Sequence, residues 1–290
     1  MIGHGLLGDD RADRLDPRSV DLAAAKEVTY VLRNDVVYEY PAPIQALQHR
    51  LVILPRLRHG DQQRLAHRLA VDAPSAAAVR SRRDRHGNPI VDVEAAEVPD
   101  RISFALRAVL RRHHGHVGAR PWRASRGSTT ELTRADDGLR EAAAAIDPRA
   151  HGERLARSIC HAVHDAMTYR HDATTVRTTA SEAWQRRQGV CQDMAHVMIA
   201  MCRARGLPAR YVSGHLVGEG ASHAWVEVHD EESGRTLALD PTHDRPTDLR
   251  YLTVAVGRDY RDVAPTAGSY RAGPSGTLSI TKAVEIADVR

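Results

Sequence analysis

One stretch of the sequence, residues 189–208, carries the strongest structural pattern: GVCQDMAHVMIAMCRARGLP. Its apolar residues recur at helical spacing, so the stretch predicts a mostly buried helix. The helix has a clear end, because arginines occupy its last turn and Gly206 and Pro208 follow it. Its start lies near Gly189, which places Cys191 in the first turn.

The position of Cys191 favours a reactive thiol. The unpaired backbone N–H groups and the positive end of the helix dipole stabilise a negative group in the first turn, and the thiolate is the form that attacks carbonyl carbons. Cys202 lies about three turns further on, roughly 16 Å away along the helix axis. It is at the unfavourable end of the helix, and we interpret it as a small core residue. A buried structural cysteine is also the alternative for Cys191, so its partners decide the interpretation.

Three strand-like runs follow the helix, at residues 209–217, 222–228 and 235–240, with a polar turn before the third. If this turn is centred on Glu231 and Glu232, His223 lies directly opposite Asp240, with Cβ atoms about 4.5–5.5 Å apart. A turn centred one residue later, or a bulge, would shift the pairing. A carboxylate opposite an imidazole is the orienting half of a nucleophile–base–acid triad.

Each partner also has a structural interpretation. A histidine in a strand is often satisfied by a backbone carbonyl, and an aspartate before Pro241 commonly starts a turn by binding its own backbone. Together with a cysteine at a helix start, His223 and Asp240 favour the catalytic interpretation.

At these residues the sequence resembles the transglutaminase-like superfamily, in particular its bacterial members with an N-terminal β-rich region. The resemblance covers residues 27 to 285, roughly, and rests on four ordered motifs, at 189–196, 206–214, 223–228 and 239–242. It implies an α+β fold. The expected core is papain-like, with the cysteine-bearing helix packed on an antiparallel sheet, and a β-sandwich-like N-terminal domain precedes it.

The resemblance also implies roles for the residues. Cys191 would be the nucleophile, His223 the general base and acid, and Asp240 the residue that orients His223. The expected enzyme acts on amide bonds, either peptide bonds or glutamine side chains, through a thioester, and needs no cofactor. It would be a cysteine peptidase or amidase (a hydrolase) or a transglutaminase (an acyltransferase), with a peptide or protein substrate. The strand at 236–239 lacks the tryptophan that many relatives place there, which bears on the substrate wall more than on the triad.

The oxyanion formed during attack needs hydrogen-bond donors, and the backbone N–H of Cys191 is the first candidate. Gln185 and Tyr169 are candidates for a second donor. The alternative for Gln185 is a solvated face rich in arginine and glutamine.

The chain divides by composition into a flexible leader (1–26), an N-terminal β-rich domain (27–112), a linker (113–134) and the catalytic core with C-terminal strands (135–290). Several short strands without long helices favour a sandwich-like module for the second segment. Helical patterns at 135–146 and 152–169 open the core.

Composition excludes several classes of protein. The formal net charge of +4 is spread along 290 residues, and no stacking aromatics accompany the arginine-rich stretches, so nucleic acid is not an expected partner. Three cysteines without a Cys-x-x-Cys spacing, no secretory signal and no long apolar run predict a cytoplasmic protein without a membrane segment. His161 and His164 share a helical face, but no recognised metal-ligand spacing is present, so no metal is expected.

The second functional class that fits the sequence is a catalytically silent binding module that keeps the transglutaminase fold. The complete Cys–His–Asp set argues against this class.

Overall fold

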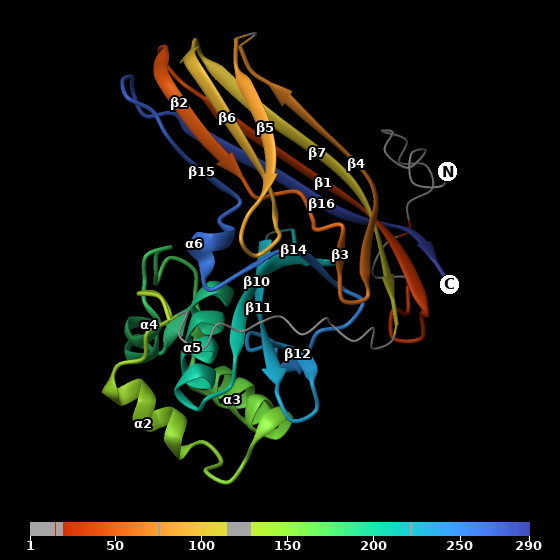
Figure 1. The fold of residues 1–290 in the computed structure, drawn as a ribbon, viewed down its shortest axis with the longest axis vertical. Coiled ribbons are helices and arrows are strands. Elements are labelled where there is room, and N and C mark those ends of the chain that lie inside the picture. The colour runs from red at the N-terminus through yellow and green to blue at the C-terminus, as the bar shows by residue number, and fades with distance from the viewer. Residues whose placement is uncertain (1–14, 16–19, 75, 115–128, 221) are drawn as a thin grey trace.

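The computed structural model describes residues 15, 20–74, 76–114, 129–220 and 222–290. Figure 1 shows a β-sandwich in one half of the molecule and, in the other, a smaller sheet with helices gathered on one side. Most of the expected leader and most of the expected linker lie outside the described residues, although Leu15 forms a bridge to Ile286 of β16 and Ala25 is buried. In the described part of the chain, no helix has the length and apolar character that crossing a membrane requires.

The sandwich consists of two antiparallel sheets whose facing apolar side chains form one core. The strand order is β16-β1-β7-β4-β3 in the first sheet and β15-β2-β6-β5 in the second. The first sheet contains β1 (Glu27–Glu39), β3 (Arg58–His59), β4 (Gln62–Asp72), β7 (Arg101–His113) and β16 (Thr277–Val289). The second sheet contains β2 (Ile44–Leu51), β5 (Ala78–Arg83), β6 (Pro89–Val98) and β15 (Thr266–Ser269).

The C-terminal strands differ from the expectation that they belong to the catalytic core. β16 pairs antiparallel with β1 along its whole length, and β15 pairs with β2, so both complete the sandwich. In Figure 1 the blue β16 lies beside the red β1. The physical reason is visible in β1, where residues 28–34 are buried without alternation. The backbone N–H and C=O groups of such a buried strand need hydrogen-bond partners on both edges. Only β7, on one edge, comes from the N-terminal segment.

β1 is one continuous strand of 13 residues. Polar residues in its middle are accommodated by neighbouring strands, because Asp35 accepts a hydrogen bond from Arg107 Nη2 (3.0 Å) and Arg33 Nε lies 3.5 Å from the Glu285 carboxylate on β16. Cross-strand pairing of this kind satisfies charges that would otherwise end a strand.

The second half of the molecule is built on a five-stranded antiparallel sheet with the order β13-β12-β11-β10-β14. Its strands are β10 (Ala209–Leu216), β11 (Ser222–Asp230), β12 (Arg235–Asp240), β13 (Arg245–Pro246) and β14 (Tyr251–Gly257). The helices are α2 (Asp137–Ala145), α3 (Gly152–Ala166), α4 (Ala180–Arg186), α5 (Cys191–Ala204) and α6 (Tyr260–Val263). A short parallel pair joins β8 (Thr168–Tyr169) to β9 (Gln188–Gly189).

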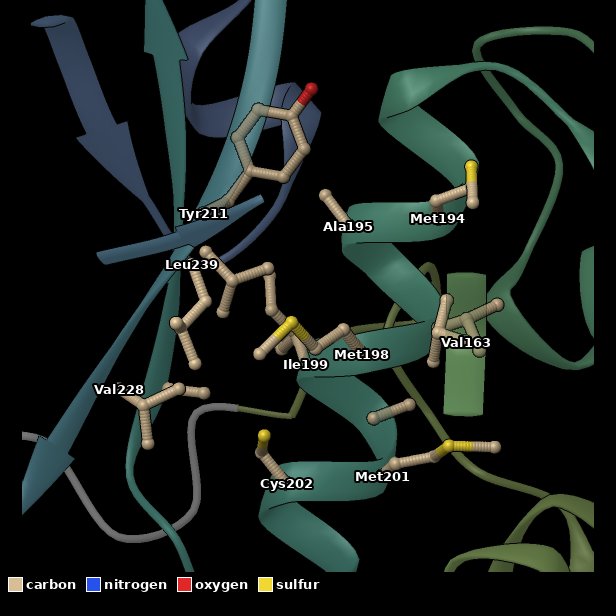
Figure 2. Packing of buried hydrophobic residues seen from close by; sticks show 14 of the residues in the cluster. Val163, Met194, Ala195, Met198, Ile199, Met201, Cys202, Tyr211, Val228 and Leu239 are labelled. Carbon is tan, nitrogen blue, oxygen red and sulfur yellow. The ribbon is translucent and has the colours of Figure 1, made fainter. Parts of the chain in front are cut away.

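Helix α5 packs against this sheet, and α2, α3 and α4 pack against α5. Alternate residues of β11 face the helix, and Figure 2 shows Met198, Ile199 and Cys202 of α5 directed at Val228 and Leu239 of the sheet. The predicted arrangement, a cysteine-bearing helix on an antiparallel sheet preceded by a β-sandwich, is confirmed.

Two buried amide side chains join the sandwich to the free edge of β14. Gln62 donates to the carbonyl of Thr253 (2.7 Å) and accepts from its N–H (2.8 Å). Asn88 does the same at Val256, with distances of 2.7 and 3.0 Å. Each amide therefore replaces the backbone of a neighbouring strand, and the edge of the sheet is satisfied without a sixth strand.

Candidate active site

Cys191 is the first residue of α5, as the sequence predicted, and its side chain is partly exposed. The start of the helix is held by the buried Asp193, whose Oδ2 accepts from the Val190 N–H (2.8 Å) and the Thr174 hydroxyl (2.6 Å). Burial raises the pKa of Asp193. A Cβ on Gly189 would lie 2.6 Å from the Asp193 Cβ, so no larger residue fits before the helix without a shift.

His223 lies on β11, and its relation to Asp240 on β12 corrects the predicted register. Val226 pairs with Leu239 and Asp230 with Arg235, so the register centred on Glu231 and Glu232 is wrong and the alternative centred one residue later is correct. Gly234, at φ +67°, supplies the left-handed residue of the turn.

The two side chains meet in spite of the shift, with His223 Nε2 2.7 Å from Asp240 Oδ2. Moving the turn by one residue shifts every pair by two positions, and side chains two positions apart point to the same face. His223 and Asp240 are therefore diagonal neighbours, which long side chains can still bridge.

His223 also has Cys191 as a hydrogen-bond partner. Because Nε2 is bonded to Asp240, Nδ1 is the ring nitrogen left for the thiol. Burial lowers the pKa of His223, but the hydrogen bonds and negative charges of Asp240 and Cys191 outweigh it and raise the pKa to about 10. His223 is therefore an imidazolium at neutral pH, next to the Cys191 sulfur.

Asp240 is completely buried and accepts hydrogen bonds on both oxygens. Its Oδ2 accepts hydrogen bonds from His223 Nε2, the Tyr251 hydroxyl (2.7 Å) and His243 Nδ1 (2.8 Å). Its Oδ1 accepts one from the Thr242 N–H (2.9 Å). Burial raises the pKa of this carboxyl, but the bond to His223 and the other donors prevail and lower it to about 2. Asp240 is therefore ionised at any physiological pH.

Sequence reasoning missed His243 and Tyr251. His243 follows Asp240 by three residues in the turn after β12, and that spacing could have suggested a second imidazole on the same carboxylate. Tyr251 starts β14, at the other side of the sheet, and Arg245 Nε donates to its hydroxyl (2.9 Å). Nothing local in the sequence connects it with Asp240.

His223, Asp240 and His243 form a group whose ligand atoms all lie within 4.8 Å of one another, a spacing that could hold a metal ion. The contacts within the group are 2.7 and 2.8 Å long, which is the length of charge-assisted hydrogen bonds. A metal bound here would take the His223 nitrogen that Asp240 now orients.

The two candidates for a second oxyanion donor differ in position. Gln185 lies on an exposed face of α4, where its amide donates to Asp136 Oδ2 (3.0 Å). Tyr169 pairs in β8 with Gly189 and is 45% exposed. Burial and the nearby negative charges of Cys191, Glu219 and Asp193 raise its pKa, so it borders the site.

His161, His164 and His196 each have a hydrogen-bond partner outside the group of Cys191, His223 and Asp240. His196 is fully buried and accepts the Tyr260 N–H at Nε2 (3.1 Å), and burial lowers its pKa to about 3. Burial raises the pKa of Cys202 to about 12, which keeps this thiol protonated. His161 binds Asp244 through Nδ1 (2.8 Å), and His164 contacts the Pro241 carbonyl (3.3 Å).

The chain is similar to known protein families and to mycobacterial proteins. A family model described as the transglutaminase-like superfamily matches residues 140–241, and one described as the bacterial transglutaminase-like N-terminal region matches residues 30–111. The uncharacterized protein Rv2569c of Mycobacterium tuberculosis (strain ATCC 25618 / H37Rv) is 32% identical over 286 residues, 86% of this chain and 90% of the relative. The chain belongs to the transglutaminase-like superfamily. The uncharacterized protein ML0607 of Mycobacterium leprae (strain TN) is 38% identical over 130 residues, 41% of this chain and 45% of that protein.

The fold of this transglutaminase-like protein is also similar to a solved structure. The crystal structure of a proposed cysteine protease from Cytophaga hutchinsonii matches 90% of this chain and 98% of its own, with a TM-score of 0.67 and 18% identity. The transglutaminase-like core match contains Cys191, His223 and Asp240, whereas β15 and β16 lie beyond both family matches.

Proposed function

We propose that this transglutaminase-like protein is an acyl-transfer enzyme in which Cys191 is the nucleophile, His223 the general base and acid, and Asp240 the orienting carboxylate. The observation that carries the proposal is the continuous hydrogen-bonded series from Cys191 through His223 to Asp240, at the N-terminus of α5. A thiolate beside an imidazolium is the activated form that covalent catalysis at a carbonyl requires.

The reaction begins with attack of the Cys191 sulfur on an amide carbonyl carbon. The resulting oxyanion accepts a hydrogen bond from the Cys191 backbone N–H, which belongs to the first turn of α5 and has no acceptor within the helix. His223 passes its Nδ1 proton to the leaving amine as the carbon–nitrogen bond breaks, and a thioester remains on Cys191.

The second half of the reaction restores the enzyme. Neutral His223 takes a proton from water or from an incoming amine, which attacks the thioester carbonyl. The carbon–sulfur bond breaks, the thiolate returns, and the product is an acid or a new amide. We favour hydrolysis of a peptide or amide bond, because water is present at every turnover, whereas transfer requires a bound amine.

The test is alkylation by iodoacetamide at pH 6, followed by intact-mass measurement. We expect a single rapid addition that is lost in Cys191→Ala, kept in the control Cys202→Ala, and slowed at least about tenfold in His223→Ala, because only the thiolate reacts. Labelling of Cys191 at the rate of a free small thiol, indifferent to His223, would contradict the proposal and favour the binding module.

A further inference from the structure

Glu219 is a carboxylate at the site that the proposed reaction does not use. It follows β10, and its Oε2 lies 3.8 Å from His223 Nδ1, while its Oε1 lies 3.3 Å from His243 Nε2. Nδ1 is the nitrogen that remains for Cys191, so Glu219 lies on the side of His223 where bonds are made and broken. Its side chain is 44% exposed and can therefore meet a substrate.

The groups that surround Glu219 leave its charge only weakly compensated. Its ion-pair partners in the described part of the chain are the two histidines. Lys282 lines the same small cavity of about 200 Å³, but its ammonium donates to the Ser222 hydroxyl, and burial lowers its pKa. Tyr169, on the Cys191 side, is neutral, and the charge of Glu219 contributes to its raised pKa after burial and Cys191.

We propose that Glu219 forms a subsite for a positively charged group of the substrate, a primary ammonium or a guanidinium, immediately beside the reacting carbonyl. The inference rests on the proposed function of Cys191 and adds a substrate class to it. A group bound between Cys191 and Nδ1 lies within several ångströms of the Glu219 carboxylate. At that separation a unit charge in a half-exposed site changes binding or rate by about five- to tenfold.

Glu219 could instead act only on the two imidazoles, by stabilising their charged forms. That role would change the thiolate content of Cys191, and it would alter the rates of all reagents by the same factor. A subsite changes the ratio between oppositely charged reagents. The ratio therefore separates the two roles.

The experiment uses two methanethiosulfonates of similar size, one carrying a trimethylammonium group and the other a sulfonate. Each transfers its thioalkyl group to the Cys191 thiolate and releases methanesulfinate, and intact mass gives the rate. The rates are divided by those measured with N-acetylcysteine amide. The proteins are wild type, Glu219→Gln and the control Glu141→Gln, which removes an exposed carboxylate from α2.

We expect the normalised cation-to-anion ratio to be about tenfold in wild type, to fall at least about fivefold in Glu219→Gln, and to stay unchanged in Glu141→Gln. High salt should reduce the wild-type ratio. A ratio that Glu219→Gln leaves unchanged, whether or not both rates fall together, would overturn the subsite and leave the nucleophile intact. Absence of labelling at Cys191 by either reagent would overturn the proposed function and the subsite with it.

Discussion

His223 Nε2 lies 2.7 Å from Asp240 Oδ2, although the two residues do not face each other in the β11–β12 hairpin. The contact is diagonal, and the same Asp240 oxygen also accepts hydrogen bonds from the Tyr251 hydroxyl and His243 Nδ1. The position of the imidazole is therefore fixed by a buried carboxylate with several donors, which leaves its Nδ1 free for Cys191.

The stability that His223 contributes should depend on pH. Burial lowers its pKa, but Asp240 and Cys191 raise it to about 10, above the value of about 6.5 in an unfolded chain. A raised pKa stabilises the fold fully below about pH 6.5, and this contribution is lost as the pH rises towards 10. The difference in unfolding free energy between wild type and His223→Gln should shrink over that interval in urea titrations. A constant difference, or the same trend in the exposed control His151→Gln, would contradict the assignment.

Asp240→Asn should remove the charge that holds the imidazolium. An asparagine keeps the size of the side chain, but its amide cannot accept all of the donors that now converge on Oδ2. By analogy with triads in which the acid is replaced by its amide, turnover of an amide substrate should fall at least about a hundredfold. Alkylation of Cys191 at pH 6 should also slow. Asp136→Asn, at the N-cap of α2, is the matched control, and a similar loss of alkylation there would point to general destabilisation.

The hydrogen bond from Tyr251 to the ionised Asp240 should be worth more than one to a neutral group. Tyr251→Phe should lower the unfolding free energy by about 1.5–3 kcal/mol, the range for bonds to charged groups. Tyr38, whose hydroxyl is 2.7 Å from the Thr266 hydroxyl, provides the neutral comparison. Tyr38→Phe should cost about 0.5–1.5 kcal/mol. Equal losses in denaturant unfolding would argue against an ionised Asp240.

Zinc should bind to the His223, Asp240 and His243 group and block the reaction of Cys191 with alkylating reagents. Imidazole and carboxylate ligands suit Zn²⁺, and a bound ion would occupy the nitrogen that Asp240 orients. We expect micromolar zinc to slow alkylation of Cys191 and a chelator to restore it. The variant His243→Gln lacks one of the three candidate ligands, and it should need at least about tenfold more zinc for the same inhibition. Unchanged zinc sensitivity in that variant would place the ion on the thiolate alone.

Gln62 should be important for stability although it is far from the chemistry. Replacing it by alanine leaves the buried N–H and carbonyl of Thr253 without partners. Each unsatisfied group costs about 1–3 kcal/mol, so Gln62→Ala should lower the unfolding free energy by about 2–6 kcal/mol. Gln185→Ala, which removes an exposed amide, should change it by less than about 0.5 kcal/mol. A small effect of Gln62→Ala would mean that the edge of β14 is satisfied by water.

The sequence was informative where the pattern is local. The helix from Cys191 to Ala204, the strands that follow it and the sandwich-like module each follow from periodicity and turn residues. The strand register was uncertain because a four-residue turn can be centred at more than one place. The contact between His223 and Asp240 survived that error only because side-chain direction has a period of two.

The parts that the sequence did not predict depend on long-range pairing. Tyr251 reaches Asp240 across the sheet, and β16 joins β1 from the other end of the chain. Helix α4 was missed because it is short, although Thr179 and Glu182 form a capping box at its start. Gln185, expected as a possible oxyanion donor, lies on that helix and is engaged with Asp136.

The pairing of β16 with β1 bears on the order in which this fold is completed during synthesis. The ribosome releases the residues of β1 long before those of β16, so one edge of β1 stays unpaired until residues 277–289 have emerged. Gln62 and Asn88, which bind the edge of the sheet that carries His223 and Asp240, belong to that unfinished sandwich. Contacts between distant parts of a chain form slowly. A nascent chain should therefore hold Cys191 in an incomplete site until β16 has paired with β1.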